Sequence, residues 1–145
     1  MEAEGRSHPA TAPRAITVHG LADALAALEA ATALGRPVVL LSAPGAAAHA
    51  GAGWFKALAD LAGQHWPQAA ATAMLDCGDR ADLAQGALRA GLADIVFTGP
   101  ASVAARLADI AGQQGARLHR RRPPALEIAE PGEAAAACRA RLGRD

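Results

Sequence analysis

This chain of 145 residues has little of several residue types that mark common functional sites. It contains no tyrosine, two tryptophans, two phenylalanines and two cysteines, and Lys56 is its only lysine. A phosphate-binding loop ending in Gly-Lys is therefore absent, and Schiff-base chemistry would have to use Lys56. No Cys-x-x-Cys or His/Cys ligand spacing occurs, so the sequence predicts no metal site.

The chain also lacks an excess of either charge, since it has 14 basic and 14 acidic residues and a net charge of zero. Without a basic excess we expect no nucleic-acid partner. No apolar run is long enough to predict a membrane helix, so we expect no membrane partner, and residues 1–14 lack the apolar segment of a secretory signal. These features favour a cytoplasmic protein in which Cys77 and Cys138 are free thiols.

The length corresponds to one domain and is too short for a complete (β/α)₈ barrel, although half a barrel would fit. Residues 1–14, with Pro9 and Pro13, read as a flexible N-terminal arm, and residues 15–145 as a single α/β domain. Alanine makes up more than half of the hydrophobic residues. The bulky part of the core is therefore smaller than the 52% hydrophobic content indicates.

Strand and helix patterns alternate along the chain. Leu21, Leu25 and Leu28 lie at i, i+4 and i+7, which is typical of one helix face. The predicted strands are 16–19, 37–41, 70–75, 93–97 and 116–119, with a short extra strand at 126–128. The predicted helices are 21–34, 53–65, 80–90, 101–113 and 133–142. This alternation indicates βαβ units, and hence a single three-layer domain with an open, Rossmann-like parallel sheet of about five strands and helices on both faces. Half of a β/α barrel, completed by a second copy, is the rival architecture.

Ligands of open parallel sheets bind outside the carboxyl ends of the strands. The turn at 98–102 joins a buried strand to a helix N-terminus, where free N–H groups and the helix dipole favour an anion. Hydroxyl groups and nearby arginines would add hydrogen bonds. The predicted ligand-binding residues are Ser42, Thr98, Gly99, Ser102, Arg120 and Arg121. The alternative is that Thr98 or Ser102 only caps the helix and that the arginines face solvent.

A second set of residues at the same edge would suit catalysis. Asp76 lies where catalytic carboxylates often lie, and Cys77 would be a nucleophile if His19 were close enough to act as its base. The alternative is that Asp79 and Asp82 mark an ordinary helix start, with Asp76 in a structural role, and that Cys77 is a small buried side chain. No Gly-x-Gly-x-x-Gly pattern follows the first strand, so no dinucleotide cofactor is predicted and no other cofactor is assigned.

The segment 79–110, and especially Ala-Leu-Arg-Ala-Gly-Leu-Ala-Asp-Ile-Val-Phe at 87–97, resembles the closing part of response-regulator receiver domains. It is also similar to late strand–helix units of phosphate-binding barrels. Receivers carry an acidic pair after the first strand, where this chain has Val18, His19 and Gly20. They also carry a lysine before a proline, where this chain has Thr98 and Gly99 before Pro100. The resemblance does not include the phosphoacceptor residues.

Three functions follow as expectations. The first is a small cytoplasmic domain that binds a small anionic, phosphate-like ligand or a protein partner at the carboxyl ends of its strands. The second is a lyase- or hydrolase-like enzyme that uses Asp76 with His19 or Cys77. The third is a non-catalytic homo-oligomeric assembly module. A homo-oligomer is expected because Trp54 and Phe55 are adjacent on one helix, so that one of them points outward.

Overall fold

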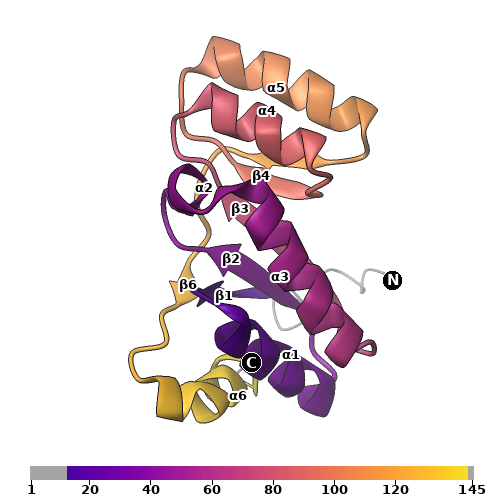
Figure 1. The fold of residues 1–145 in the computed structure, drawn as a ribbon, viewed down its shortest axis with the longest axis vertical. Helices are drawn as coiled ribbons and strands as arrows, with labels where there is room; N and C mark the ends of the chain where they lie inside the picture. Colours follow the sequence, from indigo (N-terminus) through magenta and orange to yellow (C-terminus); the bar gives the residue numbers. More distant parts are fainter. Residues whose placement is uncertain (1–12, 144–145) are drawn as a thin grey trace, which may run out of the picture.

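Six parallel strands form one open sheet in the computed structural model of this protein, which describes residues 13–143 (Figure 1). The strands are β1 (Arg14–Val18), β2 (Val38–Ser42), β3 (Ala71–Asp76), β4 (Asp94–Val96), β5 (Arg117–His119) and β6 (Ala125–Leu126). Their order across the sheet is β5-β4-β3-β2-β1-β6, and every neighbouring pair is parallel. The predicted open parallel sheet of an α/β domain is therefore confirmed.

The helices lie close to their predicted positions. They are α1 (Leu21–Leu34), α2 (Ala46–His49), α3 (Gly51–His65), α4 (Ala81–Arg89), α5 (Ala101–Gln113) and α6 (Ala134–Gly143), with a 3₁₀ turn, η2 (Pro131–Glu133), before α6. The short helix α2 was not expected. Gly35 ends α1 with a φ of 62°, a left-handed conformation that glycine adopts without strain. The predicted arm lies outside the described residues except for Pro13 and Arg14, and Arg14 already belongs to β1.

The main hydrophobic core lies between the sheet and the helices. Side chains alternate along each strand, so every second residue points to this core. In β2, for example, Val38 and Leu40 pack against the helices, while Val39 and Leu41 point to the other face. The strand residues of the core are Ile16, Val18, Val38, Leu40, Leu75 and Ile95, and they pack with side chains from all six helices.

The layering differs from the prediction in one respect. Helices were expected on both faces, but the strand residues that pack with the helices all belong to one face. Strand order explains this, because each strand from β1 to β5 is added on the same side of the one before it. Right-handed crossovers that advance in one direction place their helices on the same face. Residues 13–143 thus form two layers, a sheet and a helical layer.

The consecutive order of β1 to β5 is that of neighbouring strands in a β/α barrel, the rival architecture. The sheet is nevertheless open, with β5 at one edge and β6 at the other. Receiver-like sheets instead have the order 2-1-3-4-5. The resemblance of residues 87–97 to receivers therefore does not extend to the topology.

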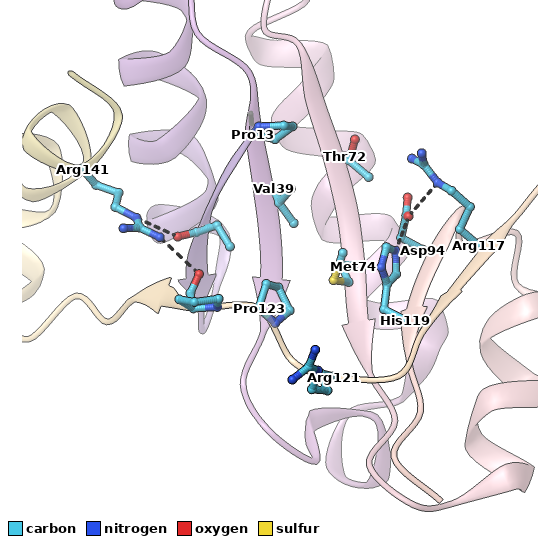
Figure 2. A pocket seen from close by; sticks show the side chains of 12 residues that line it. Pro13, Val39, Thr72, Met74, Asp94, Arg117, His119, Arg121, Pro123 and Arg141 are labelled. Carbon is cyan, nitrogen blue, oxygen red and sulfur yellow. Dashed lines mark hydrogen bonds and ion pairs between the residues drawn. The ribbon is translucent and has the colours of Figure 1, made fainter. Parts of the chain in front are cut away.

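We call the sheet face that points away from the helices the open face. Ala15, Leu41, Met74 and Val96 form a small apolar cluster on it, with Val39 and Ala125 at its margin. The connection between β5 and β6, residues 120–124, crosses the sheet near the carboxyl ends of the strands (Figure 2). This connection brings arginines from one edge of the sheet to the other.

Candidate functional site in a pocket on the open face of the sheet

Arg122, in the β5–β6 connection, lies at the carboxyl ends of three neighbouring strands. Its Nη1 donates to Asp76 Oδ2 at 2.9 Å and to the Ser42 carbonyl oxygen at 2.8 Å. Its Nη2 donates to Thr17 Oγ1 at 3.0 Å. Asp76 Oδ1 accepts a hydrogen bond from the Gly78 N–H at 2.9 Å, and Ser42 Oγ accepts one from the Asp76 N–H at 2.9 Å. The predicted residues Ser42 and Asp76 are thus brought together, and their polar groups bind one another and Arg122.

Arg120 stabilises the turn that was predicted to accept an anion. Its guanidinium donates to the carbonyl oxygens of Phe97 at 2.8 Å and Gly99 at 2.7 Å, and it lies 5.8 Å from the centre of the Phe97 ring. The Thr98 N–H donates to the Gly78 carbonyl at 2.8 Å. Ser102 is exposed, and no side chain caps α5, whose N-cap is Pro100. Anion binding by Thr98, Gly99 and Ser102 stays a prediction.

The predicted catalytic residues are not joined into one cluster. His19 Nε2 lies 3.4 Å from Glu127 Oε1, and the His19 N–H donates to Asp23 Oδ2. Within residues 13–143, no hydrogen bond or ion pair joins His19 to Asp76 or Cys77. Burial, with the charge of Asp76 as a second cause, raises the pKa of the Cys77 thiol to about 12. A raised thiol pKa disfavours the thiolate that a nucleophile needs.

A pocket of about 390 Å³ lies on the open face, bounded by strands β1 to β5, the β5–β6 connection and α6 (Figure 2). Its floor is largely apolar, and its rim carries basic side chains. The lining residues are Pro13, Ala15, Val39, Thr72, Met74, Asp94, Arg117, His119, Arg121, Pro123, Pro124 and Arg141. We call this the open-face pocket. Its volume falls in the range typical of small-molecule sites.

Asp94 is the acidic residue of the pocket lining, and it is only 1% exposed. Its Oδ1 accepts a hydrogen bond from Arg117 Nε at 3.2 Å and lies 2.8 Å from His119 Nε2 (Figure 2). Its Oδ2 is buried and has no partner within the described part of the chain. A carboxylate oxygen accepts hydrogen bonds and does not donate them, so Nε2 of His119 carries the proton. Asp94 therefore fixes both the orientation and the tautomer of the His119 ring.

Arg121 and Arg141 complete the basic rim. Arg121 is exposed and makes no hydrogen bond or ion pair within residues 13–143. Arg141, from α6, donates through Nε to the Ala15 carbonyl at 3.4 Å and through Nη2 to the Pro124 carbonyl at 3.2 Å. Neither guanidinium is paired with a carboxylate in the described structure. Among residues 13–143, these two positive charges at the pocket are therefore uncompensated.

Sequence reasoning missed Asp94, Arg117, His119 and Arg141, although part of the signal was present. Arg117 and His119 flank Leu118 in β5, and Asp94 begins the neighbouring strand β4. Polar side chains at every second position of neighbouring strands indicate a polar strip on one sheet face. Because helices were predicted on both faces of the sheet, neither face was expected to carry such a polar strip.

No protein-family model matches this chain, and no curated protein matches its sequence. Between residues 13 and 143, no helix is long and apolar enough to cross a membrane.

Proposed function

We propose that this domain binds a small organic anion in the open-face pocket. The observation that carries the proposal is the convergence of Arg117, Arg121, Arg141 and His119 around an apolar floor. Arginine guanidinium groups bind carboxylates and phosphates through paired hydrogen bonds. This keeps the anionic ligand expected from the sequence, and Arg121 with it. It puts the ligand on the sheet face over the first residues of strands β1 to β5, and not at their carboxyl ends as the sequence led us to expect.

The charges of the pocket favour an anion over a neutral ligand. Asp94 already accepts hydrogen bonds from Arg117 and His119, so its negative charge is shared by two basic groups. Arg121 and Arg141 have no carboxylate partner in the part of the chain that the structure describes. A carboxylate or phosphate between them would supply the missing negative charge, while Met74, Val39 and Pro123 would contact the rest of the ligand. We therefore expect a ligand with one or two anionic groups and a short apolar body.

Calorimetric titration with a panel of small anions tests the proposal. The panel contains inorganic phosphate, dicarboxylates, 2-oxo acids and triose phosphates. Arg121→Ala should weaken binding of the best ligand at least about tenfold, because it removes charge-assisted hydrogen bonds without disturbing a contact of the fold. Arg106→Ala is the matched control, since Arg106 is an exposed arginine of α5 in the helical layer. Equal binding by wild type and Arg121→Ala would overturn the assignment of this pocket.

A homo-oligomeric assembly module is the second candidate. The consecutive strand order and the sheet face that packs no helix favour a half-barrel completed by a second copy. Trp54 is 40% exposed while Phe55 is fully buried, so the helical layer offers another contact surface. We rank this candidate second because pairing two open faces would bring their arginines together, and like charges repel.

Light scattering on two variants separates the two contact surfaces. Val39→Asp places a charge on the open face, and Trp54→Ser removes the exposed aromatic of α3. A half-barrel dimer would be lost in Val39→Asp and kept in Trp54→Ser, whereas a dimer through the helical layer would show the reverse. A monomer at high micromolar concentration would rule out both.

We place the protein in the cytoplasm, since a reducing compartment suits the two free, buried thiols.

A further inference from the structure

The Asp94–His119 pair places a proton acceptor inside the open-face pocket. Asp94 holds Nε2 of His119 at 2.8 Å, so the lone pair of the neutral ring is on Nδ1. Nδ1 makes no hydrogen bond or ion pair in the described part of the chain. The His119 side chain is 35% exposed and lines the pocket, so a ligand can reach the ring. An oriented histidine with a free basic nitrogen is the arrangement of a general base.

The neighbours of His119 suit a reaction that develops negative charge. Arg117 donates through Nε to Asp94 Oδ1, the oxygen that His119 also contacts. The Nη groups of Arg117 make no hydrogen bond among residues 13–143. Its side chain is 72% exposed and borders the same pocket. Arg121 lines the pocket from the β5–β6 connection and has no partner between residues 13 and 143 (Figure 2). Guanidinium groups beside a base stabilise the oxyanion that forms when a proton leaves carbon.

The burial of Asp94 also favours a role beyond a surface ion pair. The carboxylate is 1% exposed, and one of its oxygens has no partner in the described structure. Burying a carboxylate with an unsatisfied oxygen costs free energy that an exposed ion pair would not. Its clearest effect is to fix the His119 ring, which is what a positioning carboxylate does for a catalytic histidine.

We propose that His119 is a catalytic general base, positioned by Asp94, for proton abstraction from a small anion with a carbonyl-activated C–H bond. In this step Nδ1 takes the proton, the C–H electron pair forms the enolate double bond, and the carbonyl oxygen gains the negative charge beside the arginines. Return of a proton from the imidazolium to carbon restores the ring and requires no oxidant or reductant. The inference rests on the proposed function, because the same pocket must first bind the anion.

Hydrogen exchange at carbon tests the step without knowledge of the natural product. Pyruvate, a carboxylate, and dihydroxyacetone phosphate, a phosphate, are incubated with the full chain in D₂O, and loss of the C–H signal is followed by NMR. We expect at least about tenfold faster exchange of the bound probe than in buffer. At saturating probe His119→Gln should abolish the acceleration, whereas Arg106→Ala should leave both binding and exchange unchanged.

The roles of the two residues are separated by the ¹⁵N spectrum of the His119 ring, assigned by comparison with His119→Gln. In the wild type Nε2 should be protonated and Nδ1 unprotonated. Asp94→Asn should lower the exchange rate and perturb this tautomer, because an amide can donate to Nε2. Binding without faster exchange, or a wild-type ring protonated on Nδ1 alone, would overturn the inference and leave the proposed function standing. Failure of both probes to bind in calorimetry would overturn the inference as well, and failure of the whole anion panel would overturn the proposed function itself.

Discussion

Gly99 is the residue where a single methyl group should be most costly. A Cβ atom at this position would lie 2.4 Å from Cζ of Phe97 and 3.0 Å from two further ring atoms. Phe97 is fully buried, so its ring has no room to move away. We expect Gly99→Ala to lower the free energy of unfolding by about 1–3 kcal/mol, as overpacked cores do. Urea denaturation measures the change.

Gly112 is the control, because it lies near the end of α5, the helix that follows Gly99. Apart from its chain neighbours and the backbone of its own helix, an added methyl group there would meet no atom within 4 Å. Gly112→Ala should leave stability unchanged or raise it by about 0.5–1 kcal/mol, since alanine restricts the unfolded chain. Equal effects of the two substitutions would show that the Phe97 ring can move and that Gly99 is not required sterically.

The two buried thiols make stability depend on alkaline pH. Burial raises the pKa of Cys77 to about 12 and that of Cys138 to about 11, from an ordinary value of 9.0. Above pH 9 the unfolded chain therefore releases protons that the folded chain keeps, and stability falls as pH rises toward 11 to 12. We expect a slope of at most roughly 1.4 kcal/mol per pH unit for each thiol.

Urea titrations between about pH 8 and pH 10.5 measure this slope. The absence of tyrosine and the single lysine leave few other groups that titrate in this range. Cys77→Ala should reduce the slope, and replacing both cysteines should nearly remove it. A slope that is unchanged in the double variant would assign the alkaline loss of stability to other groups.

At the residue scale, sequence reasoning could identify residue types at the carboxyl edge but not their partners. Arg120, Arg121 and Arg122 are adjacent in the sequence, yet their guanidinium groups lie in different places. Arg120 donates to carbonyl groups in the turn before α5, Arg121 lines the open-face pocket, and Arg122 binds Asp76. The partner of each guanidinium depends on which strand its side chain reaches in the folded sheet. The adjacent prolines, Pro123 and Pro124, do not indicate which strand each arginine side chain faces.

At the scale of elements, the β5–β6 connection stabilises the sheet through Arg122. This guanidinium joins β1, β2 and β3 through Thr17, Ser42 and Asp76. Asp76 is 6% exposed in its side chain and Arg122 is 22% exposed, so the pair is largely shielded from water. Arg122→Ala should lower the free energy of unfolding by about 3–5 kcal/mol, because a buried carboxylate loses its partner.

Chemical denaturation of matched variants checks this prediction. Arg80→Ala removes an exposed ion pair with Asp82 and should hardly change stability. Combining Arg122→Met with Asp76→Asn should recover part of the loss, since no buried charge remains unpaired. An Arg122→Ala variant as stable as Arg80→Ala would show that Asp76 is solvated without its partner.

Element positions could be predicted from the sequence because helices and strands have different hydrophobic periods and end at glycine or proline. Strand order could not, because it depends on how complete βαβ units pack. The consecutive order β1 to β5 is therefore visible only in the structure, and with it the single helical layer. The open-face pocket follows from that order, since a second helical layer would have covered it.

At the scale of the whole molecule, the net charge of zero conceals a basic patch. The 14 basic and 14 acidic residues cancel, yet the open-face pocket carries three arginines and one histidine against Asp94 alone. Long-range attraction of an anion should therefore come from this patch and not from the total charge. Added salt separates the contribution of this patch from that of the total charge. It screens exposed charges that lie further apart than about 8–10 Å at ordinary ionic strength.

We expect the Kd of the best anion of the panel to rise several-fold between about 20 mM and 200 mM NaCl, because salt screens the exposed rim arginines. Unfolding free energy should change little over the same range, since the chain is neutral overall. Arg121→Ala should bind more weakly and also show a shallower dependence on salt, because one screened charge is gone. Arg106→Ala should keep the wild-type dependence, since Arg106 lies in the helical layer. A Kd that does not change with salt would show that the bound ligand is held by the apolar floor, and the basic rim would then not be the recognition element.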